Sequence, residues 1–181
     1  MKTAVIVIDM INDFVTGVFK SDRAAKIIPN VKSLLNYARK HKVPIFYATD
    51  AHIPNVDPEF DVWGSHAVAG SWGAEIVDEL KPHKGDFRVL KRKYSAFQGT
   101  DLDHLLREMK VNTVVLTGVV TDICIQHTAA DAFFQGYKII VPTDCVEAVD
   151  AKTQEEAVRF IKKAYGPKIT TSKELMKKKW T

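Results

Sequence analysis

The sequence predicts an α/β fold in which a parallel sheet lies between two layers of helices. Short apolar runs rich in β-branched residues alternate along the chain with longer segments of helical periodicity. Each crossover between parallel strands is right-handed and must place its helix against the sheet, so helices are expected on both faces. A chain of 181 residues has the length of one domain, and we expect a single domain over residues 1–181.

Five segments have the composition of buried parallel strands, because they are short, apolar and mostly β-branched. They cover residues 4–8, 45–48, 87–90, 114–116 and 139–141. Between them, apolar residues recur at the spacing of one helical face. These faces are formed by Ile27, Ile28, Val31, Leu34, Leu35 and Ala38, by Leu102, Leu105, Leu106 and Met109, by Ile125, Ala129, Ala132 and Phe133, and by Val158, Ile161 and Tyr165.

The region 50–70 shows no clear period and is long for a connection inside a compact domain. Loops of this length usually belong to a binding or active site. Its residues with ligating or stacking side chains are Asp50, His52, Glu59, Trp63 and His66. We therefore expect this loop to contribute to the functional site.

The composition argues against several classes of protein. Hydrophobic residues make up 46% of the chain and charged residues 27%, which are ordinary values for a globular protein. No apolar run approaches the roughly 18 residues of a membrane span, so we expect no membrane partner. Met1 and Lys2 lead directly into an apolar run without the pattern of a secretory signal, so a cytoplasmic location is expected.

A formal net charge of +4 is compatible with nucleic-acid binding, but the distribution of the charges argues against it. The basic residues are scattered over predicted helix faces. The one basic run, at residues 177–179, has no interleaved aromatic side chains. We interpret this run as a solvated helix end and expect no nucleic-acid partner.

The residues just past each strand are informative, because ligands of open α/β sheets bind at the carboxyl ends of the strands. The first three predicted strands are followed by Asp9, Asp50 and Lys91, and the fourth leads through Gly118 to Cys124. The turn after the first strand contains no glycine, so a pyrophosphate could not approach its backbone. A dinucleotide site of the Rossmann type is therefore disfavoured.

Cys124 is the candidate nucleophile. With Thr121 or Asp122 as the N-cap, it falls in the first turn of a helix, where free backbone N–H groups and the helix dipole favour a thiolate. The same N–H groups could receive an oxyanion. The alternative is a packing role in the core, which is common for a single cysteine and which we assign to Cys145. Both cysteines are expected to be free, since a cytoplasmic domain of this size needs no disulfide.

Asp9 is the candidate proton acceptor for this thiol. It ends an apolar strand, where a carboxylate is costly unless it has a partner. Lys91 ends another apolar strand and is the natural partner. A purely structural ion pair between Asp9 and Lys91 is the competing interpretation.

Asp50 and His52 stand two residues apart in an extended segment, so their side chains point the same way. His66 follows fourteen residues after His52, with Glu59 between them. Imidazole and carboxylate together suit a borderline divalent ion such as Zn²⁺, with Fe²⁺ or Mn²⁺ as alternatives. The competing interpretation is a loop of ordinary polar surface residues.

Three segments together resemble the signatures of the isochorismatase-like cysteine hydrolases. They are VIDMINDF around Asp9, KRKYSAFQGTDLD from Lys91 onward, and GVVTDIC ending at Cys124. Within this superfamily the nicotinamidases, or pyrazinamidases, carry a metal site that the carbamoyl-cleaving and isochorismate-cleaving branches generally lack. The residues of this chain that are similar to that site are Asp50, His52, Glu59 and His66.

The resemblance implies a catalytic triad of Asp9, Lys91 and Cys124 and a six-stranded, mostly parallel sheet in a three-layer α/β/α fold. It also implies a cis peptide bond between Val119 and Val120. We expect the backbone N–H groups of Val120 and Cys124 to form the oxyanion hole.

The function implied by the resemblance is hydrolysis of nicotinamide to nicotinate and ammonia, for NAD salvage, with pyrazinamide as a surrogate substrate. The metal is expected on Asp50, His52 and His66, with Glu59 bound directly or through water. The substrate ring is expected to stack on Phe14, Trp63 or Tyr94. A homo-oligomer is expected. Two alternatives stay open: another small amide or carbamoyl hydrolase of the same fold, and a non-catalytic α/β ligand-binding protein in which Cys124 only packs.

Overall fold

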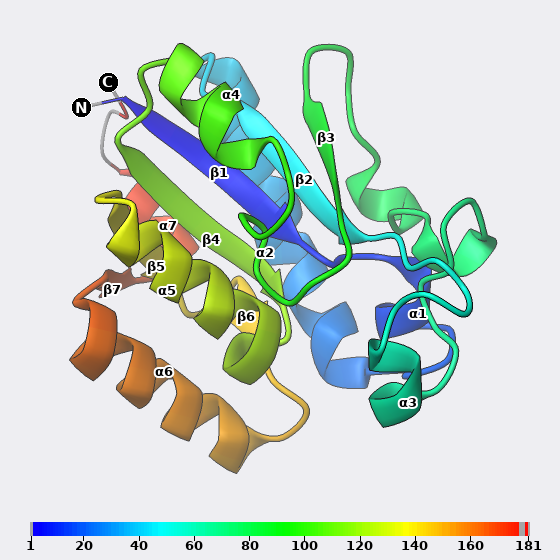
Figure 1. Cartoon of the computed structure of the whole chain (residues 1–181). Coiled ribbons are helices and arrows are strands. Elements are labelled where there is room, and N and C mark those ends of the chain that lie inside the picture. The colour runs from blue at the N-terminus through cyan, green and yellow to red at the C-terminus, as the bar shows by residue number, and fades with distance from the viewer. Residues whose placement is uncertain (1, 178–179, 181) are drawn as a thin grey trace.

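A parallel sheet forms the middle layer of the structure, and helices cover both of its faces (Figure 1). The computed structural model describes residues 2–177 and 180, and these contain seven strands. In chain order the strands are β1 (Thr3–Ile8), β2 (Ile45–Asp50), β3 (Phe87–Lys91), β4 (Thr113–Val119), β5 (Lys138–Pro142), β6 (Val146–Glu147) and β7 (Lys168–Thr170).

The sheet order is β3-β2-β1-β4-β5-β7, and the two-residue strand β6 pairs with the end of β4. All of these pairings are parallel. The expected three-layer α/β fold with a parallel sheet is thus confirmed. Six strands were expected, and β6 adds a short seventh strand among the described residues.

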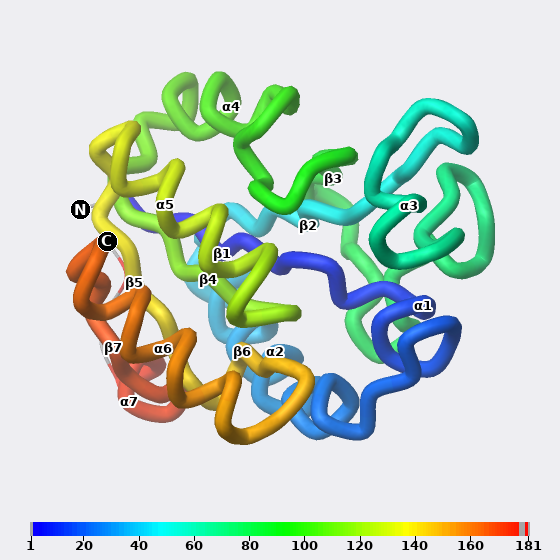
Figure 2. Tube along the Cα trace, turned by 60° about the horizontal axis from the view of Figure 1, so that its bottom comes forward, coloured from blue at the N-terminus to red at the C-terminus, as the bar shows by residue number. Residues whose placement is uncertain are grey.

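The helices of the two outer layers differ in length and in the face that they cover. They are α1 (Asn12–Val15), α2 (Asp22–Lys40), α3 (Glu59–Trp63), α4 (Leu102–Glu108), α5 (Gln126–Phe134), α6 (Ala151–Tyr165) and α7 (Ser172–Met176). In Figures 1 and 2, α4, α5 and α6 lie on one face of the sheet and α2 and α7 on the other.

Each face of the sheet has its own hydrophobic core. β1 is fully buried, and its alternate residues serve the two cores: Val5 and Val7 pack toward α2, and Ala4, Ile6 and Ile8 pack toward α4 and α5. Such a strand reads as a continuous apolar run because both of its faces are covered. This is why the continuous apolar runs in the sequence locate the central strands well.

Two side chains are more exposed than expected. Residues 87–90 were predicted as a buried strand, but β3 is an edge strand that pairs only with β2, and Leu90 is 59% exposed. Phe133 belongs to the predicted buried face of α5, yet it is 48% exposed.

β1 and β4 approach closely where both strands end. Gly118 of β4 is paired with Ile8 of β1 and has a φ of +110°, a conformation that side chains rarely adopt. A Cβ atom at this position would overlap the carbonyl oxygen of Ile8. Glycine is therefore required here, and it lets the chain continue toward Cys124 directly beside Asp9.

The connections at the carboxyl ends of the strands carry α1 and α3, which lie together at one end of the sheet (Figure 2). Among residues 2–177 and 180, no helix has the length and apolar character to cross a membrane. Of the basic run at 177–179, Lys177 is 60% exposed and pairs with Glu174, as expected for a solvated helix end. Residues 178 and 179 lie outside the described residues.

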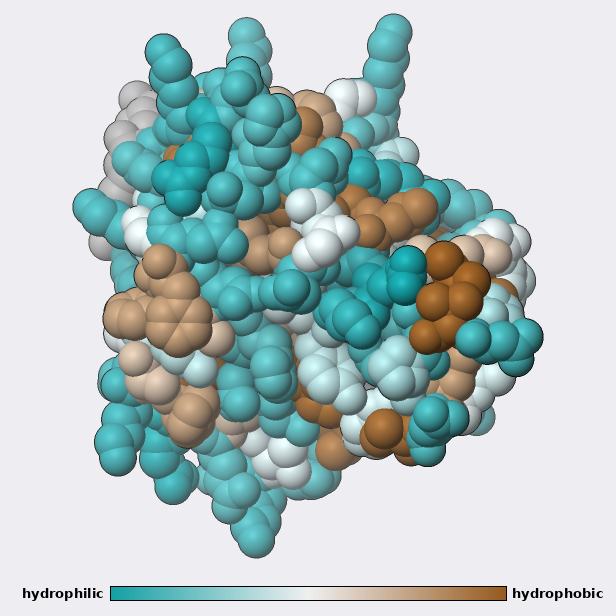
Figure 3. All heavy atoms as spheres, viewed as in Figure 1, coloured by the Kyte–Doolittle hydropathy of each residue, from teal (hydrophilic) through white to brown (hydrophobic). Residues whose placement is uncertain are grey.

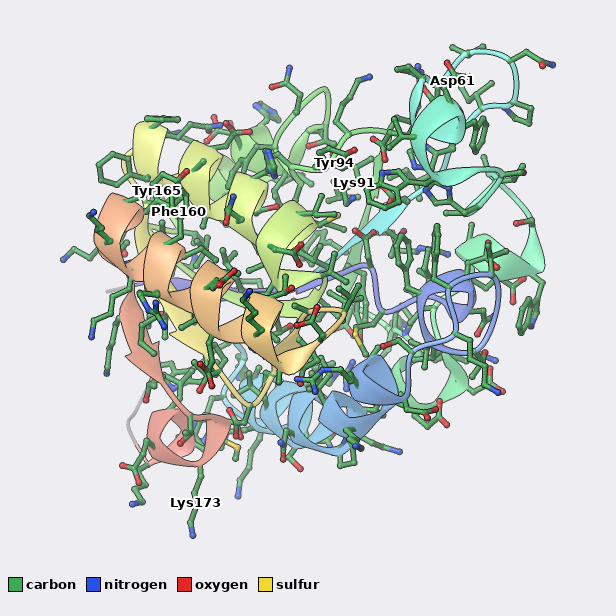
Figure 4. The ribbon with its side chains drawn as sticks, turned by 90° about the horizontal axis from the view of Figure 1, so that it is seen from below. Asp61, Lys91, Tyr94, Phe160, Tyr165 and Lys173 are labelled. Atoms are coloured by element: carbon green, nitrogen blue, oxygen red, sulfur yellow. The ribbon has the colours of Figure 1, made fainter. Side chains whose placement is uncertain are left out.

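Apolar side chains are exposed along α5 and α6, where brown-toned atoms gather in Figure 3. Phe134 is 74% exposed and Phe160 is 49% exposed, and Phe160 contacts Tyr165 edge-on (Figure 4). The expected homo-oligomer stays a prediction, since a single chain is described.

Candidate active site and metal site

The three residues of the predicted triad meet at the carboxyl end of the sheet. Asp9 follows β1, Lys91 ends β3, and Cys124 lies in a π-helical turn, Thr121–Ile125, that joins β4 to α5. Lys91 Nζ lies 2.8 Å from Asp9 Oδ2 and 3.7 Å from Cys124 Sγ. All three side chains are buried, and a carboxyl oxygen of Asp9 lies within 4.8 Å of Cys124 Sγ.

The backbone conformation orients the carboxyl group of Asp9. Its φ of 52° lies in the left-handed region, which aspartate tolerates better than most residues and which is enriched at functional sites. Oδ1 of Asp9 accepts a hydrogen bond of 2.8 Å from the backbone N–H of Asp50. The second oxygen is thereby left for Lys91 and Cys124.

Burial and neighbouring charges set the protonation of the triad. Burial raises the pKa of Asp9 to about 7, together with the nearby Asp50 carboxylate, while Lys91 opposes the shift. Burial alone would lower the pKa of Lys91, but Asp50 and Asp9 raise it well above its usual range. Lys91 is therefore a permanent cation, and Asp9 is a base suited to neutral pH.

The helix that carries Cys124 differs from the prediction in two ways. Its N-cap is Val120, without a side-chain hydrogen bond, whereas Thr121 or Asp122 was expected. Helical backbone begins at Thr121, as a π-helical turn, so both expected caps lie inside it. Burial also raises the pKa of the Cys124 thiol well above its ordinary value, although Lys91 opposes the shift. The Cys124 thiol therefore needs a base to take its proton, which is the role predicted for Asp9.

A cavity of about 170 Å³ opens beside Cys124. The peptide bond between Val119 and Val120 is cis, as expected, and both residues line the cavity. Most of the wall is apolar. The residues that line it are Phe14, Phe19, Ser21, Ala24, Asp50, Glu59, Trp63, His66, Tyr94, Val119, Val120, Ile123, Cys124, Glu147, Ala148 and Val149.

All three aromatic residues predicted to hold the substrate line this cavity. Trp63 and Tyr94 form part of its wall together, since Trp63 Nε1 donates a hydrogen bond of 3.1 Å to Tyr94 Oη. Tyr94 lies close to Lys91 in Figure 4. Sequence reasoning missed Phe19 and the segment Glu147–Val149. The two-residue strand that brings this segment to the site has no periodicity to detect.

The predicted metal ligands also come together. Asp50 ends β2, Glu59 begins α3, and His52 and His66 lie in the connections on either side of α3. One ligand atom from each of the four lies within 4.8 Å of the others. The side chain of His52 is fully buried, and neither ring nitrogen has a hydrogen-bond partner. An orphaned buried imidazole beside two carboxylates fits a divalent cation such as Zn²⁺.

Contacts outside the ligand set orient the two imidazoles. His66 Nδ1 lies 2.8 Å from the carbonyl oxygen of Gly64, which leaves Nε2 free to face the ligand set. His52 Nδ1 lies 3.4 Å from Asp57 Oδ2. Asp57 is itself fixed, because it accepts hydrogen bonds from Arg92 Nε and from the backbone N–H of Ile53. This supporting role of Asp57 was not predicted.

Asp50 belongs to both sites. Its Oδ1 lies 2.6 Å from Lys91 Nζ, and its Oδ2 lies 3.7 Å from His52 Nε2. Burial alone would raise the pKa of Asp50, but Lys91 and His52 hold it below its usual range. The sequence argument paired Lys91 with Asp9 alone, so this shared carboxylate is a finding of the structure.

Known proteins match this chain in sequence and in structure. The sequence matches the isochorismatase domain over residues 3–174. The N-carbamoylsarcosine amidase structure from Thermoplasma acidophilum is 38% identical, with a TM-score of 0.89 over 95% of this chain and 97% of that one. The nicotinamidase/pyrazinamidase PncA structure from Bacillus subtilis is 31% identical, with a TM-score of 0.89 over 94% and 100%. The pyrazinamidase of Pyrococcus horikoshii in complex with zinc is 30% identical, with a TM-score of 0.87 over 94% and 99%.

Proposed function

The chain belongs to the isochorismatase family, as a hydrolase that acts on amides, and we propose that it is a nicotinamidase that converts nicotinamide to nicotinate and ammonia. The observation that carries the proposal is the set Asp50, His52, Glu59 and His66, three of which, Asp50, Glu59 and His66, line the same cavity as Cys124. The zinc-bound pyrazinamidase among the similar structures supports a metal in this group of enzymes.

The triad can carry out the reaction with one proton carrier. Asp9 takes the proton of the Cys124 thiol as Sγ attacks the amide carbonyl carbon. The tetrahedral intermediate then expels ammonia, which leaves with the proton that Asp9 returns, and a thioester remains on Sγ. Asp9 next takes a proton from a water molecule that attacks the thioester, and this proton goes back to Sγ as the acid is released.

Lys91 and two backbone groups support these steps. Lys91, with its pKa raised by Asp50 and Asp9, keeps its positive charge and stabilises the charged forms of Asp9 and Cys124. The N–H groups of Val120 and Cys124 are assigned to the oxyanion of the tetrahedral intermediate. Both residues line the cavity into which Sγ faces, which supports that assignment.

The metal would be held by Asp50, His52 and His66, with Glu59 as a direct or water-bridged ligand. When bound, Zn²⁺, or Fe²⁺ or Mn²⁺ in its place, supplies a Lewis-acid position for the ring nitrogen of the substrate. The flat apolar part of the ring would lie against Phe14, Trp63 or Tyr94. This arrangement fixes the carboxamide for attack by Cys124, and a fixed orientation lowers the barrier strongly.

The second candidate is a carbamoyl hydrolase, favoured by the 38% identity to an N-carbamoylsarcosine amidase. N-carbamoylsarcosine carries a carboxylate as well as the cleaved group. The charged groups on the wall of the cavity include three carboxylates, and none of the described lining residues is Lys or Arg. This electrostatic environment favours a neutral amide.

A panel of amides tests the choice. Ammonia release is measured with nicotinamide, pyrazinamide, benzamide and N-carbamoylsarcosine, each with zinc-loaded enzyme. We expect nicotinamide and pyrazinamide to be the best substrates, consistent with a place in pyridine salvage. A kcat/KM that is higher for N-carbamoylsarcosine than for nicotinamide would assign the chain to the second candidate.

A further inference from the structure

We propose that Glu147 sets the charge selectivity of the cavity: it masks the guanidinium of Arg23 and keeps anionic ligands away from Cys124. The inference deepens the proposed function, because it names uncharged amides as the substrate class. The inference depends on the proposed function only for which uncharged amide is the substrate.

Glu147 is fixed in the cavity wall by the sheet. It is the last residue of β6 and is paired with Val119, next to the cis peptide bond beside the nucleophile. Its Oε1 accepts hydrogen bonds of 2.7 Å from Arg23 Nη2 and 3.2 Å from the backbone N–H of Ala148. Both Glu147 and Ala148 line the cavity. The carboxylate therefore has a defined place near the point of attack.

Arg23 lies in the first turn of α2, and its neighbours Ser21 and Ala24 line the cavity. Its side chain is one-third exposed, and its Nε is buried without a hydrogen-bond partner. A guanidinium is a good partner for a ligand carboxylate, since its N–H groups can bind both carboxylate oxygens. In this chain the carboxylate of Glu147 occupies the position that a ligand carboxylate would take beside Arg23.

Asp150 is a second carboxylate that interacts electrostatically with Arg23, and it is engaged elsewhere. Its two oxygens accept hydrogen bonds from the backbone N–H and the hydroxyl of Thr153, at the start of α6. Replacing Glu147 would therefore uncover the guanidinium of Arg23 rather than pass it to Asp150.

The selectivity would act on the product as well as on the substrate. The wall carries three carboxylates, those of Asp50, Glu59 and Glu147, whereas Lys91 and Arg23, which pair with two of them, are not among the lining residues that the structure describes. An uncharged amide enters without electrostatic cost, whereas a carboxylate is repelled. Hydrolysis of such an amide creates a carboxylate inside the cavity, so the same repulsion favours its release.

Two alkylating agents of the same shape test the proposal directly. Iodoacetamide and iodoacetate both transfer a two-carbon group to the Cys124 sulfur with loss of iodide, but only iodoacetate is negatively charged. The measured quantity is the ratio of their second-order rate constants on zinc-loaded enzyme, relative to the ratio for glutathione. Mass spectrometry assigns the adduct, and Cys145 is fully buried. We expect the wild-type enzyme to prefer iodoacetamide more strongly than glutathione does.

The variants move the ratio in opposite directions. Glu147→Gln should reduce the preference for iodoacetamide by about tenfold, because one negative charge is lost and Arg23 is uncovered. Arg23→Gln should increase the preference, because Glu147 loses its partner. Glu155→Gln removes an exposed charge of α6 outside this cavity and should leave the ratio unchanged.

An unchanged ratio in both Glu147→Gln and Arg23→Gln would overturn the proposal. The alkylation ratio does not depend on which amide the enzyme hydrolyses. If the ratio shifts as expected but nicotinamide is not hydrolysed, the charge selectivity stands and only the proposed function fails.

Discussion

Asp50 and Lys91 are register partners at the ends of two neighbouring strands, and their side chains form an ion pair of 2.6 Å. The same carboxylate faces His52 with its other oxygen, so one residue joins the metal-ligand set to the triad. The two sites therefore share one charge network. A change in either site is expected to alter the other, and the variants below are chosen to separate their contributions.

Replacing the nucleophile should remove the activity without unfolding the protein. We expect Cys124→Ala to lower kcat for ammonia release by about 10⁴-fold or more, because no other group can form the thioester. Circular dichroism and the melting temperature check the fold. Cys145→Ala is the matched control, since Cys145 lies outside the cavity lining, and its kcat should stay near the wild-type value. Wild-type ammonia release from Cys124→Ala would contradict the mechanism.

Lys91 should be needed for stability as well as for turnover. Lys91→Met leaves the Asp9 and Asp50 carboxyl groups buried without their counter-ion, and breaking such a network costs about 3–5 kcal/mol. Urea denaturation followed by tryptophan fluorescence measures the free energy of unfolding. Lys84→Met, at an exposed position, should lose little. A Lys91→Met protein as stable as wild type would show that the carboxyl groups do not depend on the ammonium.

Loss of the metal should affect positioning of the substrate rather than the nucleophile. After chelation, or in His52→Ala, we expect kcat/KM for nicotinamide to fall by about 100-fold, because the ring loses its ligand. Cys124 should still react with iodoacetamide, and benzamide, which lacks the ring nitrogen, should be a poor substrate of the intact enzyme. His104→Ala changes an exposed histidine of α4 and should match wild type. Full nicotinamide turnover by metal-free enzyme would refute this role.

Asp57 should contribute to metal affinity without touching the metal. Because it lies 3.4 Å from Nδ1 of His52, Asp57→Asn is expected to weaken zinc binding by about 10- to 100-fold. Competition with a chromogenic chelator measures the dissociation constant independently of activity. Asp61→Asn, on the exposed side of α3, is the control (Figure 4). Equal zinc affinity in Asp57→Asn and Asp61→Asn would show that Asp57 does not contribute to metal binding.

The sequence located the central strands and the site residues that follow them, because both leave local patterns. Continuous burial gives β1 and β4 their apolar runs, and a charged residue at the end of such a run is conspicuous, as with Asp9. The three signature segments and the histidine-containing loop likewise identified residues that meet at the carboxyl end of the sheet. These predictions depend on residues close together in the chain.

Contacts between segments that are distant in the chain could not be predicted from the sequence. The ion pair of Asp50 with Lys91 follows from the register of β2 on β3, which no local pattern specifies. Glu147 reaches the cavity through a two-residue strand, too short to show a period. The protonation of Cys124 depends on how deeply the tertiary fold buries it, because burial outweighs the opposing charge of Lys91.

The absence of a side chain at Gly118 allows β1 and β4 to lie close together at the end of the sheet that carries the candidate active site. In the proposed mechanism Asp9 is the general base and Cys124 is the nucleophile, and they follow the adjacent strands β1 and β4. The separation of these strands therefore limits how closely the two groups can approach. A methyl group at Gly118 would overlap the Ile8 carbonyl oxygen and would push β1 and β4 apart at the end of the sheet where the proposed proton transfer takes place. Proton transfer depends steeply on the distance between donor and acceptor. We therefore expect the reaction rate to depend on the absence of a Cβ atom at Gly118.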